Sequence, residues 1–246
     1  MSVQRSLGHD SGGGPVLVIG MHRSGTSCLT GCLQEAGLEL GEVNNQAEFN
    51  KKGNKENQAI MRLNDAVLAH NNGSWQQVPI SIEWSANDKR RRDLILASYP
   101  EDRLWGFKDP RTTITLDGWL EALPNARLVG SVRHPWEVAN SLACRNGIQL
   151  KRGLDLWTDY NRQLLRIIKS RPVLLVRFGV DSNEYLRNVR AMCRSLGLRS
   201  DVDMRFFEER YRVQRTDNTM RLSPAQLAIW EQLAQMSHRT QNTVNS

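Results

Sequence analysis

The sequence predicts an α/β fold with a central, mainly parallel sheet flanked by helices. Two observations predict it. Four short apolar runs alternate along the chain with stretches of helical periodicity, the order typical of parallel sheets. The first run, residues 16–19, is apolar at every position and leads through a glycine-containing loop into a helix. A strand that is apolar on both faces lies in a sheet covered by helices on both sides.

The elements follow from the same patterns in chain order. Strands are predicted at 16–19, 105–107, 127–132 and 173–177. Helices are predicted at 27–36, 56–70, 88–98, 115–122, 135–145, 153–169, 183–196 and 224–236. Pro135 and Pro224 suit the first turn of a helix, and Ser223 suits the N-cap before the last one. The tail beyond 236 is expected to be frayed. Segment 37–55, rich in Asn and Gly, is expected to be a long surface loop that covers part of a site.

The loop after the first strand has the layout of a phosphate-binding loop. Gly20 and Gly25 occupy the two glycine positions of the pattern GxxxxGK followed by Ser or Thr. The lysine that reaches the phosphates of ATP is missing, because Thr26 stands in its place, and Arg23 supplies a cation inside the loop. A helix N-terminus binds anions through its free N–H groups and its dipole. The loop is therefore suited to an anion other than a magnesium triphosphate.

A second anion site is predicted from residues 126–141. The apolar run 127–132 ends in Arg133, and Pro135 begins a helix that places Ser141 about two turns further on. Arg133 therefore lies at the carboxyl end of a strand, where open parallel sheets bind ligands. Arg133 and Ser141 are expected to reach one phosphate.

These motifs carry a resemblance to a known family. Arg23-Ser-Gly-Thr-Ser27 resembles the 5′-phosphosulfate loop of the PAPS-dependent sulfotransferases, and the segment from Arg133 to Ser141 resembles their 3′-phosphate segment. Trp105-Gly-Phe-Lys-Asp-Pro-Arg-Thr112 and Asn50-Lys-Lys-Gly-Asn-Lys-Glu56 resemble motifs of bacterial members. The match runs from about Val16 to Leu198. The loop, the Lys-Asp-Pro-Arg block and the Arg133 to Ser141 segment are specific together and in this order, whereas each alone is weak.

The resemblance implies a fold, a donor and a set of binding residues. The fold is the P-loop (nucleoside triphosphate hydrolase-like) sulfotransferase fold, and the donor is PAPS, with PAP as product and no metal. The donor contacts implied are Arg23, Ser24, Gly25, Thr26, Ser27, Arg133 and Ser141. Two features depart from the cytosolic animal enzymes. Cys28 replaces a common aromatic residue, and a late basic glycine-rich segment has no clear counterpart, for which Arg177, Arg210, Arg212 or Arg215 are candidate substitutes.

Four residues are candidates for the chemistry. Glu56 is the first choice as general base, and His22, whose ordinary pKa suits base chemistry, is the rival. Arg23 is expected to stabilise charge on the leaving phosphate, and Lys108 charge on the transferring sulfuryl group. Asp109 and Arg111 are interpreted equally well as ligand contacts or as an ion pair around Pro110. Most tryptophans are expected in the core, with Trp75 as a candidate wall for an acceptor.

Composition limits the class of protein. With 246 residues, 39% hydrophobic and 24% charged, the chain is expected to form one domain over 15–240 after a disordered leader, 1–14. The leader lacks the features of a signal peptide and no apolar run is long enough to span a membrane, so a soluble cytoplasmic protein is expected. The four cysteines lack metal spacing and are expected to be free thiols. The net charge of +7 is attributed to anionic ligands rather than nucleic acid, and the basic run 89–92 to a solvated helix face.

The acceptor and the oligomeric state are left open by the sequence. A sugar, lipid, peptide or small-metabolite hydroxyl, or an amine, all remain compatible with the motifs. Two other functions are kept as alternatives. One is a P-loop small-molecule kinase or ATPase, which Thr26 disfavours. The other is a non-catalytic PAP-binding protein with the same fold.

Overall fold

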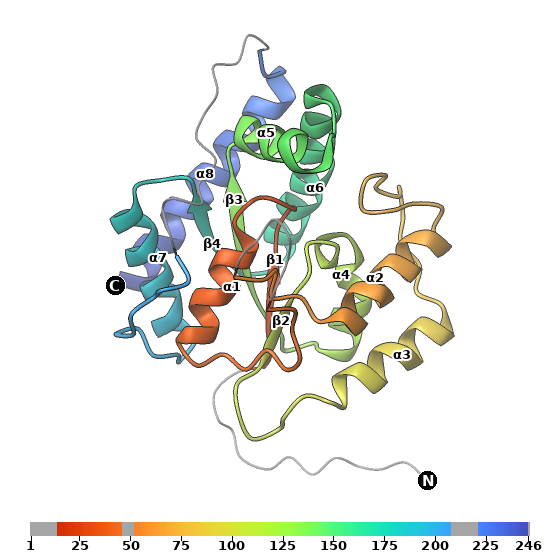
Figure 1. The fold of residues 1–246 in the computed structure, drawn as a ribbon, viewed down its shortest axis with the longest axis vertical. Coiled ribbons are helices and arrows are strands. Elements are labelled where there is room, and N and C mark those ends of the chain that lie inside the picture. Colours follow the sequence, from red (N-terminus) through yellow and green to blue (C-terminus); the bar gives the residue numbers. More distant parts are fainter. Residues whose placement is uncertain (1–13, 46–51, 208–220, 246) are drawn as a thin grey trace.

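The computed structural model describes residues 14–45, 52–207 and 221–245 of the chain. Within these residues, four strands form one sheet in which all neighbours are parallel and the order is β2-β1-β3-β4 (Figure 1). The strands are β1 (Val16–Ile19), β2 (Gly106–Lys108), β3 (Arg127–Arg133) and β4 (Val173–Phe178). The predicted α/β class with a parallel central sheet is thereby confirmed.

Eight helices surround this sheet in the described part of the chain. They are α1 (Thr26–Glu35), α2 (Gln58–His70), α3 (Ala86–Leu96), α4 (Thr112–Ala122), α5 (Pro135–Asn146), α6 (Leu150–Ser170), α7 (Ser182–Ser195) and α8 (Pro224–Asn245). All eight predicted helices are present, with ends shifted by up to three residues except in α8. The prediction of a frayed tail after 236 is wrong, since α8 continues to Asn245. Leu233 and Ile229 of α8 are buried in the core beside β4, which stabilises this helix.

The two faces of the sheet bury two different hydrophobic cores. Leu17 and Ile19 of β1 point into a core shared with α2, α4, α6 and α8, which includes Trp119 and Trp157. Val16 and Val18 point into a second core formed with α1 and α7. Figure 1 shows α2 and α4 on one side of the sheet and α1 and α7 on the other. A run apolar at every residue is therefore required, because both faces of β1 exclude water.

The strand order places a ligand-binding position at the end of β1. The chain leaves β1 through α1, adds β2 on one side of β1, and then crosses to add β3 on the other side. The connections from neighbouring strands thus diverge at the carboxyl end of β1, which is where open α/β sheets bind ligands. The glycine loop lies at this position.

Three expectations about the surface need revision or stay untested. Leu38 and Leu40 are buried, and Glu39 forms backbone hydrogen bonds with Leu104 and Gly106, so the start of segment 37–55 extends the edge of the sheet instead of lying on the surface. Arg92 is buried and donates to the carbonyl of Gly118, so only part of 89–92 is a solvated face. The leader to residue 13, residues 46–51, and Arg210, Arg212 and Arg215 lie outside the described residues.

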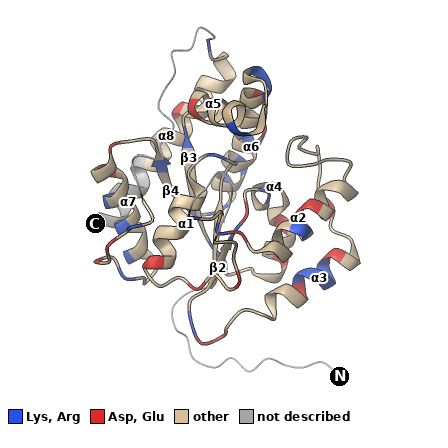
Figure 2. Ribbon diagram, in the orientation of Figure 1, with Lys and Arg blue, Asp and Glu red and all other residues tan. Residues whose placement is uncertain are grey.

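The basic residues are spread over the molecule. Figure 2 shows Lys and Arg on helices of both layers, including α3 and α7, as well as near the strand ends. The net charge of +7 is therefore not confined to the candidate site. Of the helices that the structure describes, none has the length and hydropathy needed to cross a bilayer.

Gly31 in α1 tests the packing of the second core. A Cβ at this position would lie 2.1 Å from the ring of Phe206, too close for any real contact. We expect Gly31→Ala to lower the free energy of unfolding by about 1–3 kcal/mol through overpacking, although alanine favours a helix by about 1 kcal/mol. Urea unfolding measures this. In a Phe206→Ala background the same change should be neutral or stabilising, and a more stable Gly31→Ala protein with Phe206 present would contradict the packing.

Candidate active site

The turn from β1 into α1 is tight and has unusual backbone geometry. Gly20, Arg23 and Gly25 have φ angles of 130°, 66° and 89°. The amide of Gly20 donates to Thr113 Oγ1 of α4 at 2.9 Å. Gly25 is the N-cap of α1, and no side chain caps this helix. The first turn of α1 therefore presents its N–H groups toward the carboxyl edge of the sheet, the arrangement that binds phosphate and sulfate groups.

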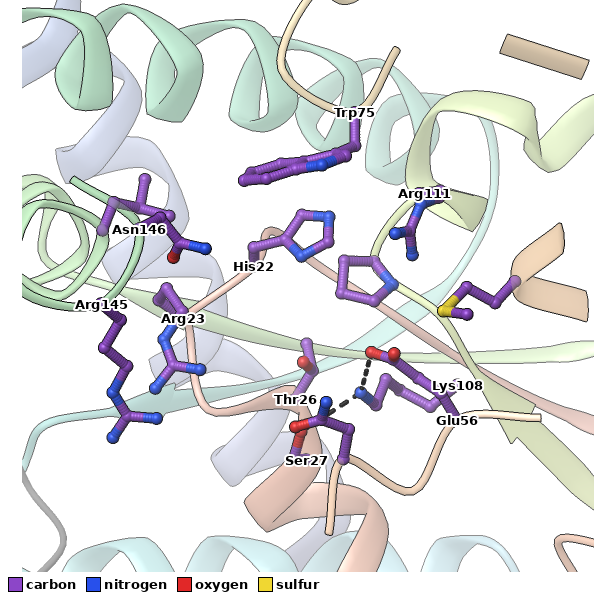
Figure 3. A pocket seen from close by; sticks show the side chains of 14 residues that line it. His22, Arg23, Thr26, Ser27, Glu56, Trp75, Lys108, Arg111, Arg145 and Asn146 are labelled. Carbon is purple, nitrogen blue, oxygen red and sulfur yellow. Dashed lines mark hydrogen bonds and ion pairs between the residues drawn. The ribbon is translucent and has the colours of Figure 1, made fainter. Parts of the chain in front are cut away.

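A cavity of about 350 Å³ opens at this position. Figure 3 shows residues from the loop, α1, the segment just before α2, α5 and the end of β2 converging on it. Its lining consists of His22, Arg23, Thr26, Ser27, Asn54, Glu56, Met61, Trp75, Lys108, Pro110, Arg111, Leu142, Arg145 and Asn146. All four candidate catalytic residues line this one cavity, although they are up to 86 positions apart, from 22 to 108.

Lys108 and Glu56 form the central polar contact of the cavity. The ammonium of Lys108 lies 2.6 Å from Glu56 Oε1 and 3.2 Å from Ser27 Oγ in the first turn of α1 (Figure 3). Lys108 is almost fully buried, at 1% side-chain exposure, so its charge requires this partner. Glu56 precedes α2, whose N-cap is Asn57, so the carboxylate lies just before the helix and not in its first turn as expected. Lys108 thus connects the end of β2 with the first turn of α1 and with the segment just before α2.

The arginines around the loop are held in place by specific contacts. Arg23 Nε donates to Ser141 Oγ at 3.0 Å, so the two motifs predicted to bind one donor are in direct contact. Arg133 Nε lies 2.9 Å from Glu137 Oε2, and Arg133 Nη1 donates to the carbonyl of Arg23 at 3.2 Å. Arg133 also lies over the ring of Phe178. Arg133 and Ser141 are thus buried next to the cavity-lining residue Arg23, and both contact it.

Arg145 is a cation of the cavity that the sequence analysis did not identify. It lies four residues after Ser141 on α5, so the spacing puts both on one face of the helix, but only the fold shows that Arg145 lines the cavity. Burial, together with the charges of Arg145 and Arg133, lowers the pKa of Arg23 to about 10. Such mutual repulsion among guanidinium groups is relieved when an anion binds between them.

His22 and Trp75 form the opposite side of the cavity. The two rings are 4.6 Å apart, and Tyr160 contacts His22 edge-on at 5.8 Å. The hydroxyl of Tyr160 donates to the backbone carbonyl of Trp75 at 3.1 Å, which fixes the position of the indole. Burial, and then the charges of Arg111, Lys108 and Arg23, hold the pKa of His22 well below 6.5. The imidazole is therefore neutral at pH 7.

The turn after β2 resolves the two interpretations of Asp109 and Arg111. Asp109 is fully buried, and its Oδ1 lies 2.9 Å from Arg111 Nη1. Arg111 Nε lies 2.6 Å from Asp65 Oδ1 of α2. Burial opposes the charge of Arg111, but Asp109 and Asp65 outweigh it and raise the pKa of this guanidinium. Asp109 is thus a structural partner, whereas Arg111 is both paired and part of the cavity wall.

The remaining predicted residues occupy the loop itself or the core. Thr26 and Ser27 line the cavity, whereas Ser24 is buried beneath the loop, where its carbonyl accepts from Ser131. Phe178 packs against Gly25, and Arg177 pairs with Glu184 away from the cavity. The four cysteines are free thiols, as expected. In the described part of the chain no cluster of three or more His, Cys, Asp or Glu is arranged to hold a metal ion.

Comparisons with known proteins identify the same family over most of the chain. Residues 15–202 match the model of the "Sulfotransferase family". Among solved structures, the chain is similar to the sulfotransferase domain from the Synechococcus PCC 7002 olefin synthase, with 16% identity, a TM-score of 0.54 and coverage of 91% of this chain and 96% of that domain. It is also similar to the sulfotransferase domain from the curacin biosynthetic pathway, with 15% identity, a TM-score of 0.54 and coverage of 90% and 98%. No curated protein matched the sequence. At these identities the structural similarity concerns the fold.

The protonation state of His22 can be tested by NMR. We expect the His22 imidazole to titrate well below 6.5, because burial and three cations disfavour its charged form. The His22→Gln variant assigns its signal. Lys108→Met should raise this pKa, because it removes one repelling cation. A titration of His22 at or above 6.5 would contradict the site geometry. Because its pKa is lowered, His22 stays neutral as the pH falls through 6.5 and becomes charged only below the lowered pKa. A step that needs neutral His22 is therefore lost only at that lower pH.

Proposed function

Because the chain belongs to the sulfotransferase family, we propose that it transfers a sulfuryl group from PAPS to a hydroxyl or amine of an acceptor and releases PAP. One observation carries this proposal. Arg23, Lys108 and Glu56 converge with the uncapped N-terminus of α1 on one cavity at the carboxyl end of a parallel sheet. Sulfuryl transfer needs an anion cradle, a cation at the transferring group and a proton acceptor, and these residues supply all three.

The loop is proposed to hold the 5′-phosphosulfate. No side chain caps the N-terminus of α1, and Thr26 and Ser27 of its first turn line the cavity, where the helix dipole favours an anion. Arg23 lies beside them and would stabilise the charge that grows on the leaving phosphate. When the acceptor oxygen bonds to sulfur, the bond from sulfur to the phosphate oxygen breaks, and Arg23 faces that oxygen in the proposed arrangement. Ser24 supports this loop through its carbonyl.

Lys108 and Glu56 are proposed to act on the transferring group and on the acceptor. Lys108 now contacts both Glu56 and Ser27. Sulfuryl oxygens bound at the N-terminus of α1 would compete with Glu56 for the ammonium. Glu56 would then be available to accept the proton that leaves the acceptor. His22 is the alternative base, since its imidazole is neutral and lines the same cavity.

The second phosphate of PAPS is proposed to bind on the α5 side of the cavity. Arg133 and Ser141 remain the residues that the motif indicates, with Arg133 already neutralised by Glu137. Arg145 supplies a further cation on the cavity wall itself. We therefore propose that Arg145 contacts this phosphate together with Ser141, while Arg133 acts directly or through Arg23, whose carbonyl it holds.

The wider assignments belong to the same proposal. We propose that 15–240 is one catalytic domain that works in the cytoplasm with PAPS as co-substrate and without a metal ion. Trp75, fixed by Tyr160, would form one wall for the acceptor. The absence of the P-loop lysine at Thr26 disfavours a magnesium-dependent kinase or ATPase, in which that lysine contacts the phosphates.

Nucleotide selectivity tests the donor. We expect calorimetry to show metal-independent binding of PAP that is stronger than binding of ATP, because the cavity offers cations and helix N–H groups but no P-loop lysine. The titration is run in the presence of EDTA and repeated with magnesium. A preference for ATP that requires magnesium would support the kinase alternative instead. Failure of a folded sample to bind either nucleotide would refute the proposed donor.

Exchange of the proposed base tests the chemistry. We expect Glu56→Gln to lower the rate of sulfuryl release from PAPS to water by about 10²–10⁴-fold, the usual contribution of a general base. PAP affinity should stay equal or increase, because Lys108 loses its anionic partner. His22→Gln should have a smaller effect on the rate. A larger loss of rate in His22→Gln than in Glu56→Gln would identify His22 as the base. PAP binding without turnover in the unaltered protein would support a non-catalytic protein.

Two arginine variants locate the second phosphate. We expect Arg145→Ala and Arg133→Ala each to weaken PAP by about 10- to 100-fold, since a charge-assisted hydrogen bond contributes about 1.5–3 kcal/mol. Adenosine 5′-phosphosulfate, which lacks the 3′-phosphate, should lose much less affinity. The exposed Arg166 on α6 provides the matched control, and Arg166→Ala should affect neither ligand. Equal losses for both nucleotides would mean that the phosphate lies elsewhere.

A further inference from the structure

Asn64, in the middle of α2, uses the full hydrogen-bonding capacity of its side chain in a buried site. Its Nδ2 donates to Asp109 Oδ2 and to Thr112 Oγ1, both at 3.1 Å. Its Oδ1 accepts from Thr115 Oγ1 at 2.7 Å and from Trp119 Nε1 at 2.9 Å. Asn64 is fully buried. A side chain with two donors and two acceptor positions satisfied in this way has one orientation only.

The same segment of α2 makes a second connection to the turn after β2. Asp65 pairs with Arg111, and Arg111 in turn pairs with Asp109 through Nη1 and donates to Asp109 Oδ1 from its backbone amide at 3.0 Å. Asn64 and Asp65 therefore hold both charged residues of this turn. The turn continues into α4, where Thr113 Oγ1 accepts from the amide of Gly20 in the anion-binding loop.

These contacts matter because the central pair of the cavity spans the same two elements. Lys108 is the residue immediately before Asp109, and Glu56 lies eight residues before Asn64, just ahead of α2. The 2.6 Å contact between Lys108 and Glu56 thus depends on how α2 sits against the end of β2. Their alignment needs to be maintained to well below an ångström for efficient catalysis.

We infer that Asn64 is a positioning residue for the sulfuryl transfer proposed above. Its carboxamide sets the register between α2 and the turn after β2, and thereby the placement of Glu56 relative to Lys108 and the anion-binding loop. Asn64 touches neither the cavity nor the reacting atoms, since it is not among the residues that line the cavity. This inference rests on the proposed function of the Glu56 and Lys108 pair.

Asn64 is not needed to bury α2, because apolar side chains already do so. Its hydrogen bonds fix the position of the helix instead. Ile60, Leu63, Val67 and Leu68 already bury this helix in the core. Apolar contacts tolerate small shifts, whereas hydrogen bonds lose most of their strength when their distance and angle change. A leucine at position 64 would add to the apolar face but leave Asp109 and Trp119 without this partner. We therefore expect α2 to remain folded but to lose its defined register.

The test compares Asn64→Leu with a control on the same helix. Val67 is fully buried, belongs to the core and forms no side-chain hydrogen bond, so Val67→Ala perturbs α2 by packing alone. For both full-length variants the melting temperature, the Kd for PAP and the rate of PAPS hydrolysis to PAP and sulfate are measured. We expect Asn64→Leu to bind PAP within about twofold of the unaltered protein but to hydrolyse PAPS about 10²-fold more slowly, as for a misplaced catalytic group. Val67→Ala should change the melting temperature but not the hydrolysis rate.

The outcomes separate this inference from the proposed function. If the unaltered protein does not bind PAP, the proposed function fails. If it binds PAP, but Asn64→Leu and Val67→Ala lower hydrolysis equally at equal loss of stability, Asn64 has only a structural role and the inference is overturned. A crystal structure of Asn64→Leu with PAP gives a readout that is independent of turnover. Separation of Glu56 from Lys108 supports the inference, and an unchanged pair overturns it.

Discussion

The turn from β1 into α1 is the constraint on which the rest of the site depends. At its two glycines there is no room for a side chain: a Cβ on Gly20 would lie 2.5 Å from the carbonyl of Ser131, and one on Gly25 would meet the ring of Phe178 at 2.4 Å. Arg23 adopts a left-handed conformation that L residues seldom take, which contacts from Ser141 and Arg133 maintain. This turn aims the N-terminus of α1 at the carboxyl edge of the sheet. All other polar groups of the cavity are arranged around that point.

The site balances its buried charges with internal partners. Lys108 pairs with Glu56, Arg111 with Asp109 and Asp65, and Arg133 with Glu137. Unpaired buried charges are costly, and these carboxylates offset that cost for the three cations. Arg23 differs, because its hydrogen-bond partner Ser141 is neutral, and burial together with neighbouring guanidinium groups lowers its pKa. Arg23 therefore leaves positive charge at the loop, where an anion is proposed to bind. The charges of Lys108, Arg111 and Arg133 are balanced by neighbouring carboxylates.

The fold is retained at sequence identities of 15–16% to two sulfotransferase domains. A fold can persist at such distance because it depends on backbone geometry and on burial more than on particular side chains. The apolar part of the cavity wall does not come from the sheet, since Trp75, Met61 and Leu142 lie on a loop and on two different helices.

The sequence by itself determined the four parallel strands, the eight helices and the family, because those follow from local patterns: apolar runs, proline at helix starts and the glycine loop. It also identified Glu56, His22, Arg23 and Lys108, which the fold brings into one cavity. Only the tertiary structure revealed the cavity position of Arg145, the polar network of Asn64, the burial of Arg92 and the length of α8. These features rest on partners tens of residues away in the chain. No local pattern encodes them, because the pairing of buried polar groups is decided by which elements pack together.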